Sequence, residues 1–66
     1  MECRINGDSF SFEYEMSIHE ILESLELDHD RIIVEHNNVL IKKKDFNEYI
    51  VREADRLELL EFVGGG

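Results

Sequence analysis

The residues best suited to a chemical role are the three glycines that end the chain, Gly64, Gly65 and Gly66. They directly follow a strand-like segment that ends at Phe62 and Val63. Glycine has no Cβ, so it reaches places that bulkier residues cannot enter, at a high entropic cost of ordering. The α-carboxylate at the end of the chain is ionised at neutral pH. The pattern is typical of a terminus that enters another protein's active site, and a frayed end without a role is the alternative.

A terminal carboxylate has one prominent reaction open to it, which is activation by ATP. Its oxygen attacks the α-phosphorus to give an acyl adenylate, and a sulfur nucleophile then displaces AMP to leave a thiocarboxylate or a thioester. Gly66 provides the unhindered acyl carbon that this chemistry needs. The chain has no glycine-rich phosphate loop, because Gly7 stands alone in a turn, so we expect a partner enzyme to hold ATP and Mg²⁺.

Other reactive side chains are few and scattered. His19, His29 and His36 show no ligand spacing, so we interpret each as a surface residue and expect no metal site. Cys3 alternates with apolar neighbours, which indicates a small buried hydrophobe rather than a nucleophile. A chain of 66 residues also offers little room for a catalytic cleft. We therefore expect a protein that is not an enzyme and binds no cofactor of its own.

Composition and charge narrow the range of partners. The formal net charge is −9, which argues against nucleic acid, because phosphate binding needs a basic surface. The one basic cluster, residues 42–44, is interpreted as a solvated turn. No apolar run approaches the roughly 20 residues of a membrane span, and the N-terminus lacks the apolar segment of a signal peptide. With a single cysteine, these features predict a cytoplasmic protein that docks on basic partner surfaces.

The elements that must position the terminus follow from the hydrophobic periodicity. Alternation on both sides of Asn6-Gly7 predicts a β-hairpin over residues 1–14. The same alternation places Phe10, Phe12 and Tyr14 on the buried face of its second strand. The hairpin should therefore supply one edge of an apolar core.

A helix and two short strands are predicted next. Ser17 and Glu20 form a capping box, and the apolar stripe after it predicts an amphipathic helix of about ten residues that ends near Leu27. β-Branched residues predict strands at 32–34 and 39–41, separated by an asparagine turn. The helix should lie across one face of the sheet.

The last part of the chain returns to strand character. One helical turn capped by Asp45 would direct Phe46 and Tyr49 inward. Residues 57–62 form the last predicted strand, which runs straight into the glycines. The order β-β-α-β-β, a helical turn and β predicts a two-layer α+β domain.

The ending and the order of elements resemble the thiamine-pathway sulfur carriers, the ThiS family of ubiquitin-like β-grasp proteins. The resemblance covers the whole chain, and its specific parts are residues 51–57 and 61–66. The family's terminal diglycine matches Gly65-Gly66, and its acidic-glycine-aspartate turn is matched except that Ala54 stands in the glycine position.

That resemblance implies a β-grasp fold, with a mixed sheet of four to five strands and one main helix packed on one face. The domain would comprise residues 1–63, and residues 64–66 would form a flexible glycine tail. The last strand would lie centrally, beside the first.

The resemblance also implies a function. The Gly66 carboxylate would be adenylated by a ThiF-type adenylyltransferase and converted to a thiocarboxylate with sulfur from a cysteine desulfurase or sulfurtransferase. The thiazole synthase ThiG would accept that sulfur. The expected partner contacts, of which Leu60 and Phe62 could instead belong to the core, are Leu60, Phe62, Val63, Gly64 and Gly65.

Two alternatives stay open. Another β-grasp sulfur carrier, such as the small subunit of molybdopterin synthase or a ubiquitin-like modifier, would share the ending. A β-grasp adaptor that only binds, with an inert tail, belongs to another class. The short length and the Phe-Val-Gly-Gly-Gly ending favour the thiamine carrier.

Overall fold

The computed structural model describes residues 1–63. Within them the chain forms seven strands, one α-helix and two 3-10 turns. In chain order these are β1 (Glu2–Ile5), β2 (Asp8–Ser11), β3 (Met16–Ser17), α1 (Ile18–Ser24), η1 (His29–Arg31), β4 (Ile32–His36), β5 (Val39–Ile41), η2 (Lys43–Asp45), β6 (Ile50–Val51) and β7 (Arg56–Glu61).

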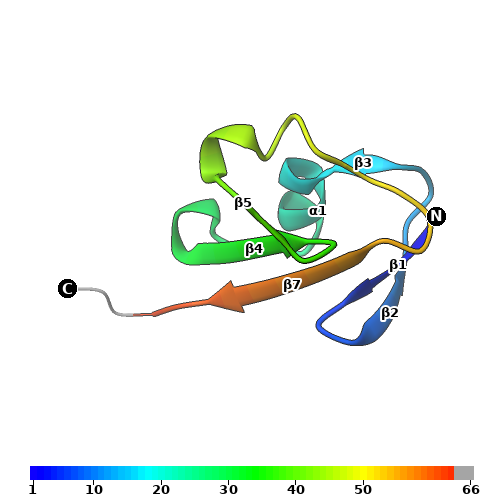
Figure 1. Cartoon of the computed structure of the whole chain (residues 1–66), viewed down its shortest axis with the longest axis horizontal. Coiled ribbons are helices and arrows are strands. Elements are labelled where there is room, and N and C mark those ends of the chain that lie inside the picture. The colour runs from blue at the N-terminus through cyan, green and yellow to red at the C-terminus, as the bar shows by residue number, and fades with distance from the viewer. Residues whose placement is uncertain (64–66) are drawn as a thin grey trace.

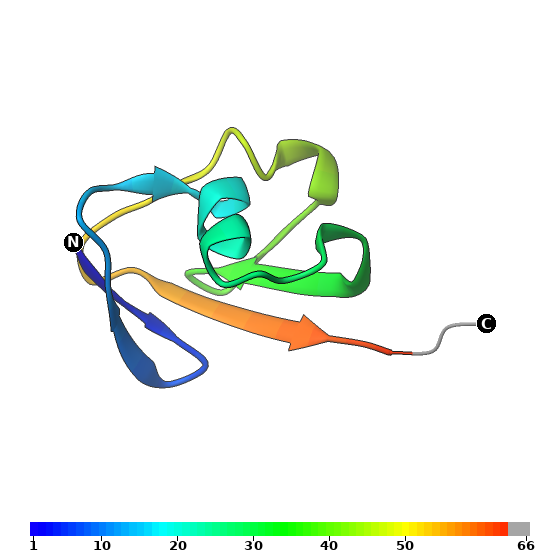
Figure 2. The same ribbon diagram turned by 180° about the vertical axis from the view of Figure 1, so that it is seen from behind.

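Five of the strands form one mixed sheet in the order β2-β1-β7-β4-β5. The central strand β7 pairs in parallel with β1, where Ile5 lies opposite Leu57, and antiparallel with β4, where Val34 lies opposite Leu59. Helix α1 covers one face of this sheet (Figures 1 and 2). The predicted mixed sheet with one helix on one face is confirmed, and so is the central place of the last strand.

Two short strands form a second, two-stranded sheet that the sequence did not predict. β3 and β6 pair antiparallel, with Met16 opposite Val51. Each strand has only two residues, which is too short for an alternation pattern. Their pairing ties the start of α1 to the chain after η2, where the Ile18 N–H also donates to the Tyr49 carbonyl at 2.9 Å.

Both predicted hairpin turns are confirmed by positive backbone φ angles. Asn6 and Gly7 have φ of 52° and 87°, and Asn37 and Asn38 have φ of 51° and 70°. Two successive positive angles match the type I′ turn, whose twist suits antiparallel strands and favours asparagine and glycine. The first turn also braces the central strand, because the Asn6 side chain accepts from the Leu59 N–H at 2.8 Å and donates to the Leu59 carbonyl at 3.1 Å.

The predicted capping box begins α1 as expected. The Glu20 N–H donates to the Ser17 hydroxyl at 3.1 Å, and the Ser17 N–H donates to the Glu20 carboxylate at 2.9 Å. These two bonds satisfy backbone donors that the first helical turn would otherwise leave without partners. The start of the helix is therefore set by its own local sequence.

The predicted end of the helix near Leu27 is wrong, because α1 ends at Ser24. Glu26 adopts a left-handed φ of 58°, its N–H donates to the Glu23 carbonyl, and the Leu27 N–H donates to the Leu22 carbonyl at 2.9 Å. These bonds form a Schellman motif, which closes a helix. Leu27 still packs against the core, so the apolar stripe continues after the helix has ended.

Two left-handed residues with side chains give a stability prediction. Glu26 and Ala54 have φ of 58° and 69°, a conformation that costs an L-residue about 1–2 kcal/mol and costs glycine nothing. We expect Glu26→Gly and Ala54→Gly each to raise the free energy of unfolding by about 0.5–1 kcal/mol, after the greater entropy of unfolded glycine is subtracted. Urea unfolding measures the change. Ser24→Gly, inside α1, should lower stability instead, and the same loss at Glu26 would contradict the left-handed assignment.

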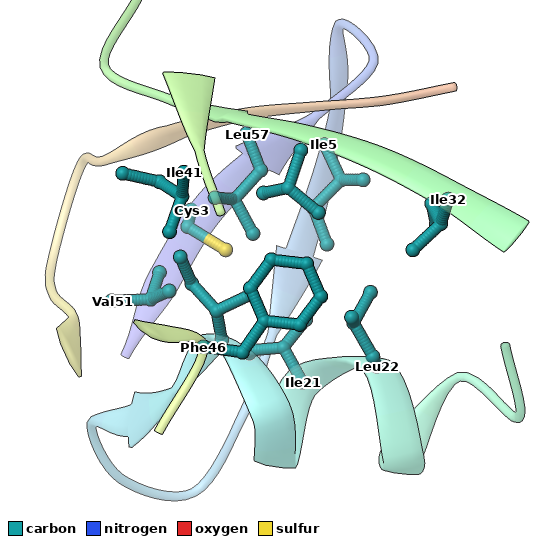
Figure 3. Close-up of a cluster of buried hydrophobic side chains, with 11 residues drawn as sticks. Cys3, Ile5, Ile21, Leu22, Ile32, Ile41, Phe46, Val51 and Leu57 are labelled. Atoms are coloured by element: carbon teal, nitrogen blue, oxygen red, sulfur yellow. The ribbon is translucent and has the colours of Figure 1, made fainter. Parts of the chain in front are cut away.

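The core fills the space between α1 and the inner face of the sheet. Figure 3 shows the Phe46 ring in the middle of this cluster, with the Cys3 sulfur pointing into it. The expectation that Cys3 is a small buried hydrophobe is confirmed by its 1% exposure. The buried apolar residues are Cys3, Ile5, Ile18, Ile21, Leu22, Ile32, Val34, Ile41, Phe46, Val51 and Leu57.

The expected burial of Tyr14 is wrong, since 62% of its surface is exposed. Phe10 and Phe12 are half-buried and pack against the core, as predicted. Strand β2 ends at Ser11, and the chain then bends towards β3. Alternation beyond the end of the strand no longer reports which face of the sheet a side chain occupies.

The predicted helical turn capped by Asp45 lies earlier in the chain. It is η2, whose N-cap position is Lys42 and whose last residue is Asp45. Phe46 points inward as expected, with 2% exposure, but the inward prediction for Tyr49 is wrong, because it is 42% exposed. The turn ends before Tyr49, so the helical spacing that would place both rings on one face does not apply. No helix within residues 1–63 has the length and apolar character to cross a membrane.

Candidate functional site

The central strand β7 leads directly to the terminal residues. It is held by β1 on one side and β4 on the other, and the Phe62 N–H continues the pattern by donating to the Arg31 carbonyl at 3.0 Å. Figure 1 shows that the described chain leaves the end of β7 in the direction of the strand, away from the body of the sheet. The next residue, Val63, is 88% exposed. The end of the described chain is therefore anchored up to Phe62 and free of the core after it.

Three of the predicted contact residues are exposed on or just after β7. Leu60 is 63% exposed and Phe62 is 44% exposed, so neither belongs to the core, and Val63 follows them. Their role in docking stays a prediction. The predicted roles of Gly64 and Gly65 as contacts, and of Gly66 as the reacting terminus, concern residues outside the described part of the chain.

Leu60 belongs to an apolar patch on the sheet face opposite α1. Ile33 lies directly across from Leu60 in the β4–β7 register, and Leu40 is the partner of Glu35 in the β4–β5 register. We call Ile33, Leu40 and Leu60 the outer apolar face. Glu35 lies opposite Glu58, which brings two carboxylates to the same face. The outer face therefore combines apolar side chains with charged ones, since Arg56 also shares the exposed side of β7 with Glu58.

Sequence reasoning missed Ile33 and Leu40. Both lie in short runs of apolar residues, 32–34 and 39–41, which read as strand without showing which side is buried. In β4 only Ile32 and Val34 are buried, and Ile33 points to the other side. The signal that could have found Ile33 is the strict alternation expected of a sheet with one solvent-exposed face.

A hydrogen-bonded turn sets the position where β7 begins. The Asp55 carboxylate accepts from the Arg52 N–H at 2.9 Å, lies 2.7 Å from His36 Nε2 and accepts from the Asn37 side chain at 3.1 Å. Asn37 in turn accepts from the Arg56 N–H at 2.8 Å. Asp55 thus connects the β4–β5 turn to the first residue of the central strand.

The charge of Asp55 gives a prediction about pH. Partial burial would raise the pKa of the Asp55 carboxyl, but hydrogen bonds from His36, Arg52 and Asn37 outweigh it and hold that pKa below its usual value. A lowered folded pKa stabilises the protein above the unfolded pKa of about 3.9, and the contribution is lost as pH falls through the folded value.

We therefore expect Asp55→Asn to lower the free energy of unfolding by about 1 kcal/mol at pH 7. The effect is modest because Asp55 is partly exposed and solvent screens its charge. The difference from the original chain should shrink towards zero as the solution is made acidic. Chemical unfolding at neutral and acidic pH measures it. A difference that stays constant with pH would show that the Asp55 charge does not contribute.

Cys3 is poorly suited to chemistry. Burial raises the pKa of its thiol, and the Asp55 and Glu53 carboxylates raise that pKa further. The thiolate is the reactive form of cysteine, so a raised pKa suppresses attack and metal binding. The structure supports the interpretation of Cys3 as a core residue.

The interpretation of the three histidines as surface residues holds only in part. Each is half-buried, and His36 bonds Asp55 at the start of β7. His19 and His29 come together with Glu23 beside α1, with one potential ligand atom from each residue within 4.8 Å of the others. The spacing of His19 and Glu23 on one helix face was readable from the sequence, but the return of the chain that brings His29 back was not.

Known proteins are similar to this chain in both sequence and fold. The model of the ThiS family matches residues 3–66, which is nearly the whole chain. The chain belongs to the ThiS family. The family resemblance inferred from its ending and element order is therefore confirmed.

Relatives of this ThiS-family chain differ in length. This chain is 31% identical over 64 residues to the sulfur carrier protein ThiS of Bacillus subtilis, and the match covers 96% of this chain and 97% of that protein. It is 32% identical over 66 residues to a thiazole synthase of Paramagnetospirillum magneticum, covering 100% of this chain but only 20% of that protein. The chain thus spans about a fifth of the length of that curated relative.

A solved structure bears out the fold. The crystal structure of a thiamine biosynthesis protein (ThiS) from Geobacter metallireducens matches with a TM-score of 0.86 and 26% identity over the whole of both chains. The mixed sheet with one helix is thus the β-grasp fold of the ThiS family. In this chain, the left-handed φ of Ala54 explains why a glycine suits that position.

Proposed function

We propose that the chain is a sulfur carrier in thiamine biosynthesis and that the Gly66 carboxylate carries the sulfur. Membership in the ThiS family and the relation to a Bacillus subtilis protein named a sulfur carrier support the general role. One structural observation supports the site. The central, firmly paired strand β7 leads into the exposed residues Phe62 and Val63, directly before the terminal glycines.

The chemistry proceeds at the terminal carboxyl group in two steps. A carboxylate oxygen attacks the α-phosphorus of ATP, the bond to the β-phosphate side breaks, and pyrophosphate leaves. Sulfur delivered at the oxidation level of hydrosulfide then attacks the acyl carbon, and AMP leaves with the oxygen. The product is a thiocarboxylate at Gly66. A ThiF-type adenylyltransferase holds ATP and Mg²⁺. A cysteine desulfurase or sulfurtransferase supplies the sulfur as a persulfide, and two thiols reduce it to the hydrosulfide level as they are oxidised to a disulfide.

The chain contributes position and access to this chemistry. β7 fixes the point from which the terminus extends, because β4 pairs with it up to Glu61 and β1 pairs with its first residues, Arg56 and Leu57. After Val63 the sequence contains only glycine, so no side chain hinders entry of the acyl carbon into a narrow active site. Gly64 and Gly65 provide the reach between the anchored strand and the reacting atom.

The outer apolar face would be the surface on which the partner enzyme docks. Ile33, Leu40 and Leu60 are exposed beside Glu35 and Glu58, and the whole chain has a net charge of −9. An apolar groove with a basic rim on the partner would complement this surface, because opposite charges steer association and apolar contacts slow dissociation. Phe62 and Val63 would extend the same contact towards the partner's active site.

The acceptor of the sulfur is proposed to be thiazole synthase, ThiG. Thiazole synthases of Paramagnetospirillum magneticum and Magnetococcus marinus each match this chain over a fifth of their own length. A ThiS-like segment within those proteins supports a functional pairing of carrier and synthase. It does so without requiring that this chain ever be part of a larger protein.

A transfer experiment tests the pathway. The thiocarboxylated chain is mixed either with thiazole synthase and its other substrates or with the large subunit of molybdopterin synthase. We expect the sulfur to leave the carrier and thiazole to form in the first mixture only. Transfer to the molybdopterin enzyme alone would favour the other sulfur pathway. Failure of every ThiF-type enzyme to exchange pyrophosphate with the chain present would favour an adaptor that only binds.

A further inference from the structure

Three potential metal ligands come together where the side of α1 meets η1. His19 and Glu23 are one helical turn apart, with 2.8 Å between His19 Nε2 and Glu23 Oε1. The His29 ring meets the His19 ring edge-on, with 4.5 Å between their centroids. One potential ligand atom from each of the three residues lies within 4.8 Å of the others.

The backbone holds these residues in place from both sides. The His19 N–H donates to the Phe46 carbonyl at 3.0 Å, and the capping box fixes the turn of α1 that carries His19. His29 is the first residue of η1, whose start is capped by an Asp28 carboxylate that accepts from the Asp30 N–H at 2.9 Å. The Schellman motif that ends α1 turns the chain back between these two elements.

The ligand set matches the preferences of one class of metal ion. Two imidazole nitrogens and one carboxylate oxygen suit Zn²⁺ and similar divalent transition metals, whereas Mg²⁺ and Ca²⁺ prefer oxygen ligands throughout. Zn–N bonds of about 2.0–2.1 Å place the ligand atoms of a tetrahedral site roughly 3.3 Å apart. The 2.8 Å between His19 and Glu23 is close to that value, and no two of the three ligand atoms are more than 4.8 Å apart, so small side-chain rotations would form the site.

The surroundings of the cluster favour a cation with an open coordination position. A shallow hollow is lined by the three residues together with Glu26, Leu27 and Asp28, so further carboxylates lie nearby. The side chain of His19 is 37% exposed and that of Glu23 is 65% exposed. Solvent can therefore reach the centre of the cluster and supply a fourth ligand.

We propose that His19, Glu23 and His29 bind one Zn²⁺ ion or a similar divalent transition-metal ion, with water in the remaining position. The site is separate from the outer apolar face. It includes a residue of η1, and η1 also bonds the chain just before the terminal glycines. Arg31, two residues after His29, accepts the Phe62 N–H. A bound ion would hold η1 against α1 and would thereby stiffen the segment from which the terminus departs.

Metal titration of the chain, with any affinity tag removed, tests the proposal. Isothermal titration with Zn²⁺ should show one ion per chain, and Co²⁺ should give the visible absorption of a low-symmetry site. His29→Ala and Glu23→Gln should each weaken Zn²⁺ binding by about tenfold or more, because loss of a ligand costs at least as much as loss of a residue that supports one. His36→Ala, which removes the histidine bound to Asp55, should bind Zn²⁺ normally.

A measurement on the unaltered chain keeps the test independent of how the variants fold. In NMR spectra, Zn²⁺ should shift the ring signals of His19 and His29 and leave those of His36 unchanged, and Mg²⁺ should shift none of them. Absence of saturable Zn²⁺ binding would overturn the proposal. Equal binding by a folded His19→Ala/His29→Ala double variant would do the same, since it would place the ion elsewhere.

Discussion

Deletion of Gly65 and Gly66 is expected to abolish sulfur loading while leaving stability nearly unchanged. Loading requires an acyl carbon that reaches the partner's active site, and a chain ending at Gly64 presents its carboxylate two residues too early. The buried apolar residues of the described chain all lie at or before Leu57, and Leu59 is the last partly buried one that packs on them. The free energy of unfolding should therefore change by less than about 0.5 kcal/mol. Pyrophosphate exchange and thermal unfolding measure the two effects.

Cys3→Ala provides the matched control for this deletion. It removes the only thiol and leaves the terminus intact, so it should lower stability slightly and still accept sulfur. A truncated chain that loads sulfur as well as the full chain would contradict the assignment of Gly66. A large loss of stability in the truncated chain would show that the terminal residues contribute to the folded domain.

Leu57→Ala is expected to have the largest effect on folding. Leu57 is 1% exposed and sits in the central strand opposite Ile5. Truncating a buried leucine removes apolar contacts and leaves a cavity, at a cost of about 2–5 kcal/mol. A single core in a domain of this size rarely supplies more than about 3–5 kcal/mol, so much of the population should be unfolded at 37 °C. Circular dichroism with urea unfolding measures the loss.

Leu60→Ala is the matched variant on the same strand. Leu60 is 63% exposed on the outer apolar face, so its loss should change the free energy of unfolding by about 0.5 kcal/mol or less. Its affinity for the activating enzyme should fall by roughly tenfold, the typical effect of losing an apolar anchor from an interface. Unchanged affinity, with folding intact, would place the docking surface elsewhere on the domain.

Much of the fold could be predicted because its signals are local. Asn6-Gly7 and Asn37-Asn38 tolerate the positive φ angles of hairpin turns, and the Ser17–Glu20 capping box satisfies its own backbone donors. Such features depend on a few neighbouring residues, so they can be predicted from a single sequence. The family resemblance added what local physics does not supply, the central place of β7 beside β1.

The errors arose at the ends of secondary-structure elements and where distant segments meet. Tyr14 and Tyr49 lie beyond the ends of β2 and η2, so extending each pattern misjudged which side is buried. Glu26 ends α1 through a left-handed conformation that its residue type does not signal. His29 meets His19 because the chain turns back after the helix, and no spacing along the sequence encodes that meeting.

The most direct test of the sulfur-carrier account is mass spectrometry of the chain after incubation with ATP, Mg²⁺, a ThiF-type enzyme and a sulfur donor. The account predicts that the intact mass rises by the difference between one sulfur and one oxygen atom. Fragmentation should place that change on the C-terminal residue Gly66. An unchanged mass under conditions that load another ThiS protein would contradict the account, and so would sulfur found on Cys3 instead of Gly66.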